Sequence, residues 1–314
     1  MENKRIHSLP HFANVNRRNI LANQCTTAPS LALLCLVISG CDDLGQQIDA
    51  LTGEQDKQVQ ALIERTKAQM VFVEGGSFMM GDGGGPNNLP WTIARDNKPA
   101  HKVTLTSYSM GAYEVSYGDF DLYTAVNDLP RTMWTKWDKD EFWRAPEFPA
   151  GVSWYGAKNY CLWLAKLTQL PIDLPTEAQW EFAARNRGEN ILFATNTGML
   201  ELGVNYSLAE EPEPHISGTY PPNPLGFYDL SGNMIEWVND WWAEDYYQHS
   251  PEQDPKGPKE GTKKVMRGGR FLESPRGSNV YTRQESDELD EAYRAKGFRC
   301  ALNQAKSLSV QAVN

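Results

Sequence analysis

The chain alternates between segments with a regular spacing of apolar residues and longer segments without one. Residues 70–80 are rich in β-branched and aromatic side chains and end in a glycine-rich turn, a pattern that predicts strands. A second extended segment, residues 101–116, alternates Val103 and Leu105 with polar residues, as a half-buried strand does. The folded domain is therefore expected to begin at Met70.

Three helices are predicted inside this domain. Residues 117–127 carry apolar side chains at helical spacing, and a longer helix is expected to open at Ser153 and to run through Leu167. The third begins at Thr176, which has Gln179 three residues further on, the spacing of a capping box. Beyond Arg187 regular patterns largely stop, so this part is expected to be held by loop packing and turns.

The amino-terminal residues have a different pattern. Basic residues precede a short apolar run, Leu31 to Ile38, which is too short to cross a hydrocarbon layer of about 30 Å as a helix. Residues 1–40 are therefore expected to be an export signal, and a buried helix is the alternative. The sequence Ile38-Ser39-Gly40-Cys41 resembles a bacterial lipobox, which implies a lipid anchor on Cys41.

The residues that follow Cys41 indicate how the domain is attached. Asp42 resembles the signal that keeps lipoproteins at the inner membrane in enteric-type bacteria. Residues 41–69 are polar with a few apolar residues at helical spacing, so we expect a lipidated tether with a helical segment. Residues 304–314 are expected to be a carboxy-terminal tail.

Composition and charge narrow the function classes. With 314 residues and 40% hydrophobic residues the chain can build a substantial core. Its formal net charge of −10 leaves no basic face to neutralise phosphates, so nucleic acid is not expected as a partner. Signal removal and lipidation would leave only Cys161 and Cys300. An even pair in an oxidising compartment suggests one disulfide, and two unrelated buried thiols are the alternative.

Two segments carry candidate chemistry. Asp229 and Glu236 flank a Gly-Asn turn that could aim carbonyls and carboxylates at a Ca²⁺ ion, although the two acids could also cap the turn or be solvated. The loop from Arg267 to Arg283 contains four arginines. We expect Arg267 and Arg283 to pair with Glu273, Glu285 and other acids to hold the segment, and leave anion binding open for Arg270 and Arg276. No zinc spacing, nucleophile elbow, P-loop or dinucleotide motif occurs.

Several segments, in one consistent order, resemble the formylglycine-generating enzyme family, also called the sulfatase-modifying-factor domain. They are residues 70–81, 113–116, 152–157 with 160–161, 174–185, 222–230, 232–233 with 236–237, 267–269 and 297–299. The resemblance implies a single α+β domain at residues 70–303, with the C-type-lectin-like formylglycine-generating-enzyme fold and low regular secondary structure.

The resemblance also implies a metal and a disulfide. Members of the family hold a structural Ca²⁺ at the positions that match Asp229, Gly232, Met234 and Glu236, the middle two through carbonyls. A second family calcium site near Asn205 is not expected, because residues 207–215 depart from the pattern. Cys161 and Cys300 fall where family members carry a disulfide, which implies that they are paired.

The chain departs from the family at the catalytic positions. Copper-dependent members need two cysteines in the loop after the Gly-Gly pair, and aligning Gly268-Gly269 with that pair puts Glu273 and Ser278 at those positions. Neither side chain suits a soft cuprous ion, so no copper is expected. The histidine-rich partner domain of the iron-dependent relatives is absent as well.

These observations favour a non-catalytic, calcium-stabilised binding lipoprotein of the bacterial periplasm. Its former substrate groove would dock a protein partner through Arg270, Glu273, Arg276 and Ser278. Relatives are found with gliding machineries and type VI secretion clusters, so a regulatory, scaffold or immunity role is expected by analogy. Two alternatives stay open. One is a metal-dependent oxidase of altered chemistry acting on a peptide or small precursor, and the other is a structural cell-envelope component.

Overall fold

The computed structural model describes residues 53–85, 87–132, 142–207 and 213–308. The chain divides into two units, residues 1–43 and 44–314, and all described residues belong to the second. The expected export signal, Cys41, Asp42 and the end of the expected carboxy-terminal tail lie outside the described residues. Among those that are described, no helix is both long and apolar enough to cross a membrane.

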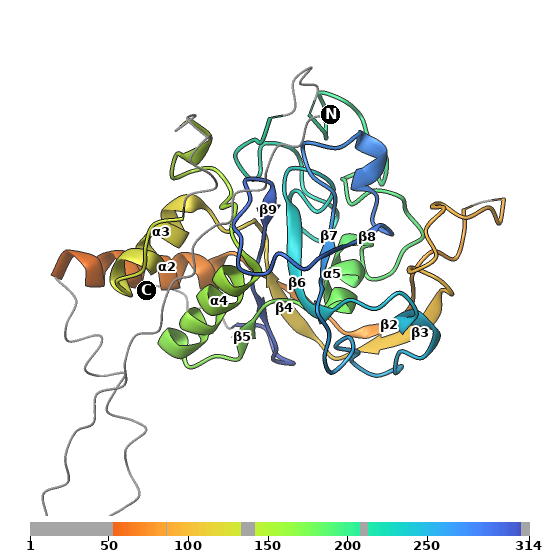
Figure 1. Cartoon of the computed structure of the whole chain (residues 1–314), viewed down its shortest axis with the longest axis horizontal. Coiled ribbons are helices and arrows are strands. Elements are labelled where there is room, and N and C mark those ends of the chain that lie inside the picture. Colours follow the sequence, from red (N-terminus) through yellow and green to blue (C-terminus); the bar gives the residue numbers. More distant parts are fainter. Residues whose placement is uncertain (1–52, 86, 133–141, 208–212, 309–314) are drawn as a thin grey trace, which may run out of the picture. The chain divides into compact units, whose positions relative to one another are not determined.

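The described residues form four α-helices (Figure 1). They are α2 (Gly53–Ala68), α3 (Tyr117–Val126), α4 (Trp154–Thr168) and α5 (Glu177–Ala184). Ser153 accepts a hydrogen bond from Gly156 N at the start of α4, and Thr176 with Gln179 forms a complete capping box on α5. The three helices expected inside the domain are therefore confirmed, each close to its expected start. Short 3₁₀ turns lie at Phe142–Arg144, Tyr246–Gln248 and Pro275–Ser278.

The strands form three small sheets. The first has the order β1-β4-β10-β5, with β1 (Met70–Val73), β4 (Tyr108–Gly111), β10 (Ala301–Leu302) and β5 (Ile172–Asp173). The second is the antiparallel pair of β2 (Gly76–Met80) and β3 (His101–Leu105). Both extended segments that the pattern predicted are thus split into two strands, and the α+β fold is confirmed.

The third sheet was not expected from the sequence. Its order is β8-β7-β6-β9, with β8 (Arg283–Ser286), β7 (Lys264–Arg267), β6 (Ile235–Trp241) and β9 (Lys296–Gly297). All four residues of β7 are buried, and β6 is buried along most of its length. A strand buried on both faces shows no alternation of apolar and polar residues, so the periodicity gave no signal after Arg187.

Helix α2 packs against the domain. Its residues Val59, Leu62 and Ile63 are buried, and Leu62 belongs to the same apolar cluster as α3, α4 and β6. The helical segment expected in the tether is therefore held against the folded body. Cys161 of α4 forms a disulfide with Cys300, next to β10, across a Cα–Cα distance of 5.7 Å. This is the pairing that the family resemblance implies.

Candidate functional site

The candidate site is the loop between β7 and β8, where the sequence resemblance implies the family's catalytic positions. The loop opens at Gly268 and Gly269, both with positive φ (99° and 72°). A Cβ at Gly269 would lie 2.6 Å from the Cα of Ser278, and one at Gly268 would lie 3.1 Å from the Trp180 ring. Only glycine combines that backbone conformation with such close contacts. The Gly-Gly pair thus folds the loop back onto its own 3₁₀ turn.

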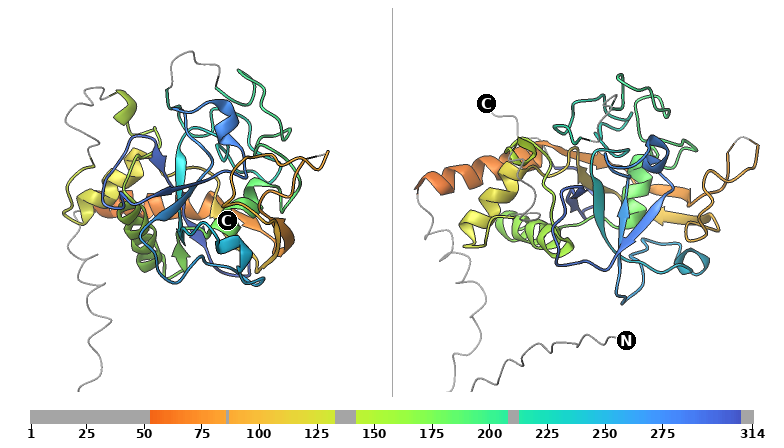
Figure 2. Two further views of the ribbon diagram at one scale, coloured as in Figure 1. Left: turned by 45° about the vertical axis from the view of Figure 1, so that its right-hand side comes forward. Right: turned by 45° about the horizontal axis from the view of Figure 1, so that its top comes forward.

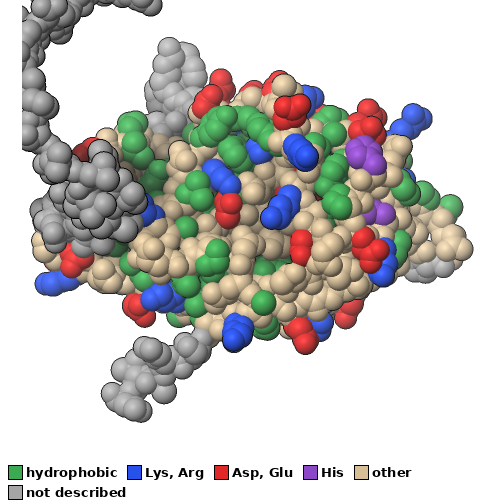
Figure 3. All heavy atoms as spheres, turned by 90° about the horizontal axis from the view of Figure 1, so that it is seen from below, with side chains coloured by type: hydrophobic (Ala, Val, Ile, Leu, Met, Phe, Trp, Pro, Cys, Tyr) green, Lys and Arg blue, Asp and Glu red, His purple; other side chains and the backbone are tan. Residues whose placement is uncertain are grey.

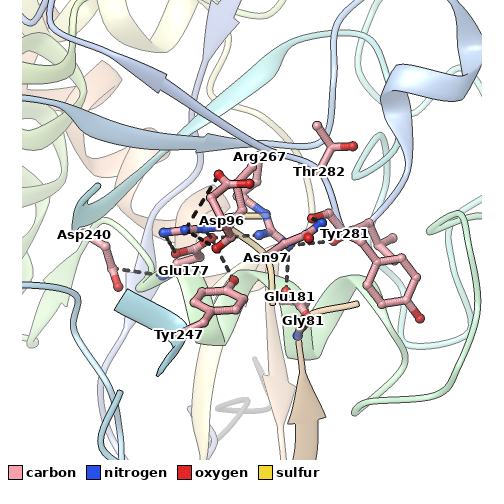
Figure 4. Close-up of polar contacts among 12 residues, drawn as sticks. Gly81, Asp96, Asn97, Glu177, Glu181, Asp240, Tyr247, Arg267, Tyr281 and Thr282 are labelled. Carbon is pink, nitrogen blue, oxygen red and sulfur yellow. Dashed lines mark hydrogen bonds and ion pairs between the residues drawn. The ribbon is translucent and has the colours of Figure 1, made fainter. Parts of the chain in front are cut away.

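Buried ion pairs from α5 hold both ends of this loop (Figure 4). Arg267, which is fully buried at the end of β7, donates to Glu177 Oε1 and Glu181 Oε2, both at 2.8 Å. Arg283, at the start of β8, donates to both oxygens of Glu177 at 2.7 and 3.0 Å. Two acids on successive turns of one helix therefore anchor two strands.

The charges in this cluster stabilise one another. Burial alone would raise the pKa of Glu177, but the guanidinium groups of Arg283 and Arg267 outweigh it and hold that pKa below its usual value. The Tyr247 hydroxyl donates a further hydrogen bond to Glu177, at 3.1 Å. Asp240 lies at the edge of the cluster and accepts from Glu177 N, while burial and the nearby Glu177 carboxylate raise the pKa of Asp240 to about 7.

Arg267 and Arg283 therefore have the structural role that was expected, with different partners. Neither contacts Glu273 or Glu285, because those acids pair elsewhere: Glu273 with Arg270 and Glu285 with Lys263. The partners of the arginines, Glu177 and Glu181, lie 86 to 106 residues earlier in the chain. No sequence pattern indicated this pairing directly, although both acids belong to a segment that resembles the family.

The outer part of the loop contains the other candidate residues. Arg270 Nε lies 2.8 Å from Glu273 Oε1, and both Glu273 oxygens also accept from Gln284 Nε2, at 3.1 and 3.0 Å. Arg276 is exposed. Ser278 is fully buried and lies 2.9 Å from the Tyr206 hydroxyl. The prediction that Ser278 belongs to a partner-binding surface is therefore wrong, because its buried side chain cannot contact a partner.

A carboxylate cluster lies beside this loop and contains the expected calcium ligands. Asp229 accepts from His215 Nε2 at 3.0 Å and from Gly218 N at 2.7 Å. Glu236 is buried and is held by the Arg299 guanidinium and by the Trp180 indole, at 2.9 Å. Neither acid is solvated.

Glu114 is a third member of this cluster that the sequence analysis did not single out. It accepts hydrogen bonds from Met234 N, from Asn233 Nδ2 and from the Ser217 hydroxyl. Complete burial, with the carboxylates of Asp229 and Glu236 nearby, raises the pKa of Glu114 well above its usual value. The only signal for its importance was its place in the Tyr113–Ser116 segment, which resembles a family motif.

The cluster tests whether the residues fit a cation. Three carboxylates face one arginine, Arg299, and one histidine, His215, so negative charge is in excess unless a proton or a cation is added. Among the hydrogen bonds of the described residues, none ends on the carbonyl oxygens of Gly232 or Met234. The described residues contain no three His, Cys, Asp or Glu side chains arranged to hold a metal, so a cation here would depend on those carbonyls. In charge and oxygen donors the residues fit Ca²⁺.

Asn205, near the family's second calcium site, has a different role. Its Oδ1 accepts from Glu201 N, and its Nδ2 donates to Asn196 Oδ1 at 2.9 Å. The side chain closes its own loop. Part of the neighbouring segment, residues 208–212, lies outside the described residues.

The described residues contain no cysteine with a free thiol. The sequence contains five cysteines, of which Cys25, Cys35 and Cys41 lie outside the described residues. The other two form the Cys161–Cys300 disulfide. The loop itself offers oxygen and nitrogen atoms only.

One face of the described residues is shown in Figure 3. On this face acidic, basic and apolar side chains are interspersed without a large field of one sign.

Comparison with known proteins assigns the fold to a family. The model of the sulfatase-modifying factor enzyme 1-like domain matches residues 56–304. The chain is 31% identical to a protein named serine/threonine-protein kinase pkn1 from Chlamydia pneumoniae, over 75% of this chain but only 38% of that protein's length. It therefore resembles about two fifths of that relative, and the kinase name carries no activity to this chain.

Two mouse relatives bear on catalysis. The chain is 28% identical to the formylglycine-generating enzyme, over 75% of both proteins. It is 27% identical to the inactive C-alpha-formylglycine-generating enzyme 2, over 74% of this chain and 85% of that protein. Overall similarity does not separate the enzyme from its inactive relative. A solved structure, PvdO from Pseudomonas aeruginosa, superimposes with a TM-score of 0.63 at 26% identity, over 75% of this chain and 94% of PvdO.

Proposed function

Because this chain belongs to the sulfatase-modifying factor enzyme 1-like domain family, we propose that it is a non-catalytic binding protein built on that family's fold. The observation that carries the proposal is the fate of the cysteines. Both cysteines of the described domain are joined in one disulfide, and no cysteine occurs between Cys161 and Cys300. The β7–β8 loop therefore has no thiolate to hold Cu(I) or to form a mixed disulfide with a substrate thiol.

The two positions that replace the cysteines already have partners inside the protein. Glu273 is engaged by Arg270 and Gln284, and Ser278 is buried against Tyr206. Tyr281, which an oxidase of altered chemistry could use, is also buried and donates to Asn190 at 2.8 Å. These contacts support a loop that keeps its shape for binding.

We assign the docking surface to the exposed part of this loop. Arg276 is exposed and Arg270 is half-buried, and the rigid base beneath them is the buried cluster of Arg267, Arg283 and Glu177. A guanidinium group on a rigid base binds carboxylates with little loss of conformational freedom. The proposed partner is a protein that presents acidic side chains.

The remaining features of the proposal concern location and stability. The lipobox supports lipidation of Cys41 and a periplasmic domain on the inner-membrane side, with a regulatory, scaffold or immunity role that could belong to a secretion system. For stability, Ca²⁺ would be held by Asp229, Glu236 and the carbonyls of Gly232 and Met234, where it would neutralise the excess of carboxylate charge.

Photo-crosslinking in the producing cells tests the docking surface. A photoreactive amino acid replaces Arg276, and a matched control replaces Lys259, an exposed residue outside the loop. We expect one discrete crosslinked protein at position 276 that is absent at position 259. The same pattern of products at both positions would contradict a specific docking surface and would favour a structural envelope component.

A further inference from the structure

The segment between β2 and β3 exposes apolar side chains that the proposed docking surface does not involve. It protrudes from the ends of these strands at one end of the described structure (Figures 1 and 2). We call residues 87–98 the projecting loop. Two of its apolar side chains are unusually exposed for residues of their type, Ile93 at 105% and Leu89 at 69%. Exposure of that extent is unfavourable in water and points to a surface that is covered in use.

The loop is held rigidly from the inside. Buried Asp82 accepts hydrogen bonds from the backbone N–H groups of Gly84, Trp91 and Thr92, at 3.0, 3.1 and 2.8 Å. Lys98 lies 3.1 Å from the same carboxylate and donates to the carbonyl oxygens of Thr92 and Ala94, at 3.0 and 2.7 Å. Asp82 and Lys98 therefore make their polar contacts within the loop and hold its backbone in place. Leu89 and Ile93 are exposed on an ordered loop that these contacts stabilise.

The exposed charge beside the apolar side chains is a cation. Arg95 is exposed, and within the described residues no ion pair or side-chain hydrogen bond is found for its guanidinium group. The two acids of this region face inward: Asp82 is buried, and Asp96 accepts from the Trp242 indole at 3.2 Å and lies 3.7 Å from Arg283. Because Lys98 is paired with Asp82, the charge that this region presents to solvent is the guanidinium group of Arg95.

A hollow of about 570 Å³ lies at the base of the loop. Its lining includes Arg95, the amides of Asn88 and Gln248, the glycines Gly83 and Gly84, and the ion pair of Asp82 with Lys98, whose charges cancel. The guanidinium group of Arg95 and the two amides can donate to an anionic phosphate group, and the apolar side chains next to the hollow suit acyl chains.

We propose that the projecting loop is a membrane-contact site that seats the phosphate of an anionic phospholipid in this hollow, with Leu89 and Ile93 entering the acyl region. An anionic phospholipid surface offers a phosphate group to the cation and acyl chains to Leu89 and Ile93, which are 69% and 105% exposed. A protein partner that covers the loop is an alternative outcome of the test below. The proposal does not depend on a lipid anchor at Cys41 or on the docking surface at Arg276.

Vesicle co-sedimentation of the full chain tests the proposal at limiting lipid. The vesicles contain phosphatidylcholine alone or phosphatidylcholine with phosphatidylglycerol, and all variants share the same amino terminus. The double variant Leu89→Ser/Ile93→Ser should lower the partition coefficient for anionic vesicles about tenfold or more, because each buried aliphatic side chain favours binding substantially. Arg95→Gln should lower it for anionic vesicles and leave neutral vesicles unaffected.

The matched control is Met199→Ser/Val204→Ser, which removes two apolar side chains of 61% and 57% exposure from another loop. Inorganic phosphate is added as a competitor, and failure to displace the protein at millimolar concentration supports a lipid over a free phosphate. The proposal is overturned if the loop variants bind vesicles as tightly as the wild type does. It is also overturned if they lose no more binding than the control variant loses. It is also overturned if they abolish self-association or a protein contact while vesicle binding is unchanged.

Discussion

At the scale of single residues, Arg267 illustrates how charge replaces apolar packing beneath the candidate loop. Its guanidinium group is fully buried and is shared between Glu177 and Glu181. Removing one partner of a buried pair leaves the other charge uncompensated, which is more harmful than replacing the whole pair. Arg283 and Arg185 remain near these two acids and would relieve part of the loss.

We predict that Arg267→Met lowers the free energy of unfolding by about 3–5 kcal/mol. Arg276→Met, on the same loop but exposed, should change it by no more than about 0.5 kcal/mol. Urea unfolding of both variants measures the difference. Equal midpoints for the two variants would show that the buried cluster does not support the fold.

Asp240 makes the stability of the protein depend on pH. Its pKa of about 7 in the folded protein lies above the ordinary value of 3.8, because burial and the nearby Glu177 disfavour its charged form. The folded state therefore binds the proton more tightly than the unfolded state does. This contribution is fully present below pH 4 and is lost as the pH rises through 7.

Asp240→Asn should remove that loss, since asparagine keeps an oxygen that can accept from Glu177 N and carries no charge. At pH 7.5 the variant should be more stable than the wild type, by an amount on the order of 1 kcal/mol or more. The advantage should shrink at pH 5. Lys264, whose pKa is lowered to about 8, titrates above this window and acts with the opposite sign. A wild-type protein whose unfolding midpoint is the same at pH 5 and pH 7.5 would refute this role for Asp240.

At the scale of elements, the sequence predicted what depends on local pattern. The capping box of Thr176 and Gln179 fixed the start of α5. Alternation predicted β3, and the run of β-branched and aromatic residues before a glycine-rich turn predicted β2. The sheet of β6, β7 and β8 could not be predicted this way, since β7 and most of β6 are buried on both faces. Arg267 and Arg283, at the ends of β7 and β8 that flank the loop, have partners that are distant in sequence. For the site, motifs identified the glycine pair and the positions of Glu273 and Ser278. The contacts that join Glu114, His215 and Arg299 to the carboxylate cluster became visible only in three dimensions.

Helix α2 provides a test at this scale. A helix in a free tether would gain nothing from Leu62, but in the structure this side chain is 1% exposed and packs in the cluster with α3 and α4. We predict that Leu62→Ala lowers the free energy of unfolding by about 2–5 kcal/mol. Gln60→Ala, on the exposed face of the same helix, is the control and should change it by less than about 0.5 kcal/mol. If Leu62→Ala left the free energy of unfolding unchanged, α2 would not be part of the folded domain's core.

At the scale of the whole molecule, the proposed Ca²⁺ site in the carboxylate cluster would couple ion binding to folding. If Ca²⁺ binds only the folded state with a Kd near ~10 µM, then 1 mM Ca²⁺ adds about 2.7 kcal/mol to the stability. We therefore predict a higher melting temperature with Ca²⁺ than with chelator. Asp229→Asn should abolish the difference, and Asp245→Asn, which is exposed, should preserve it. The same melting temperature with Ca²⁺ and with chelator would contradict the proposed Ca²⁺ site.

The absence of free thiols in the domain is the whole-molecule property from which the proposed function follows. It is tested most directly by Cu(I) titration and oxygen consumption on a full chain in which Cys25, Cys35 and Cys41 are replaced by serine, so that only the folded domain is probed. We predict no Cu(I) binding that competes with a chelator, and no oxygen consumption with a cysteine-containing peptide. The Glu273→Cys/Ser278→Cys variant should gain Cu(I) binding. Stoichiometric copper binding or turnover of the peptide without those two substitutions would contradict the proposal that this protein binds and does not catalyse.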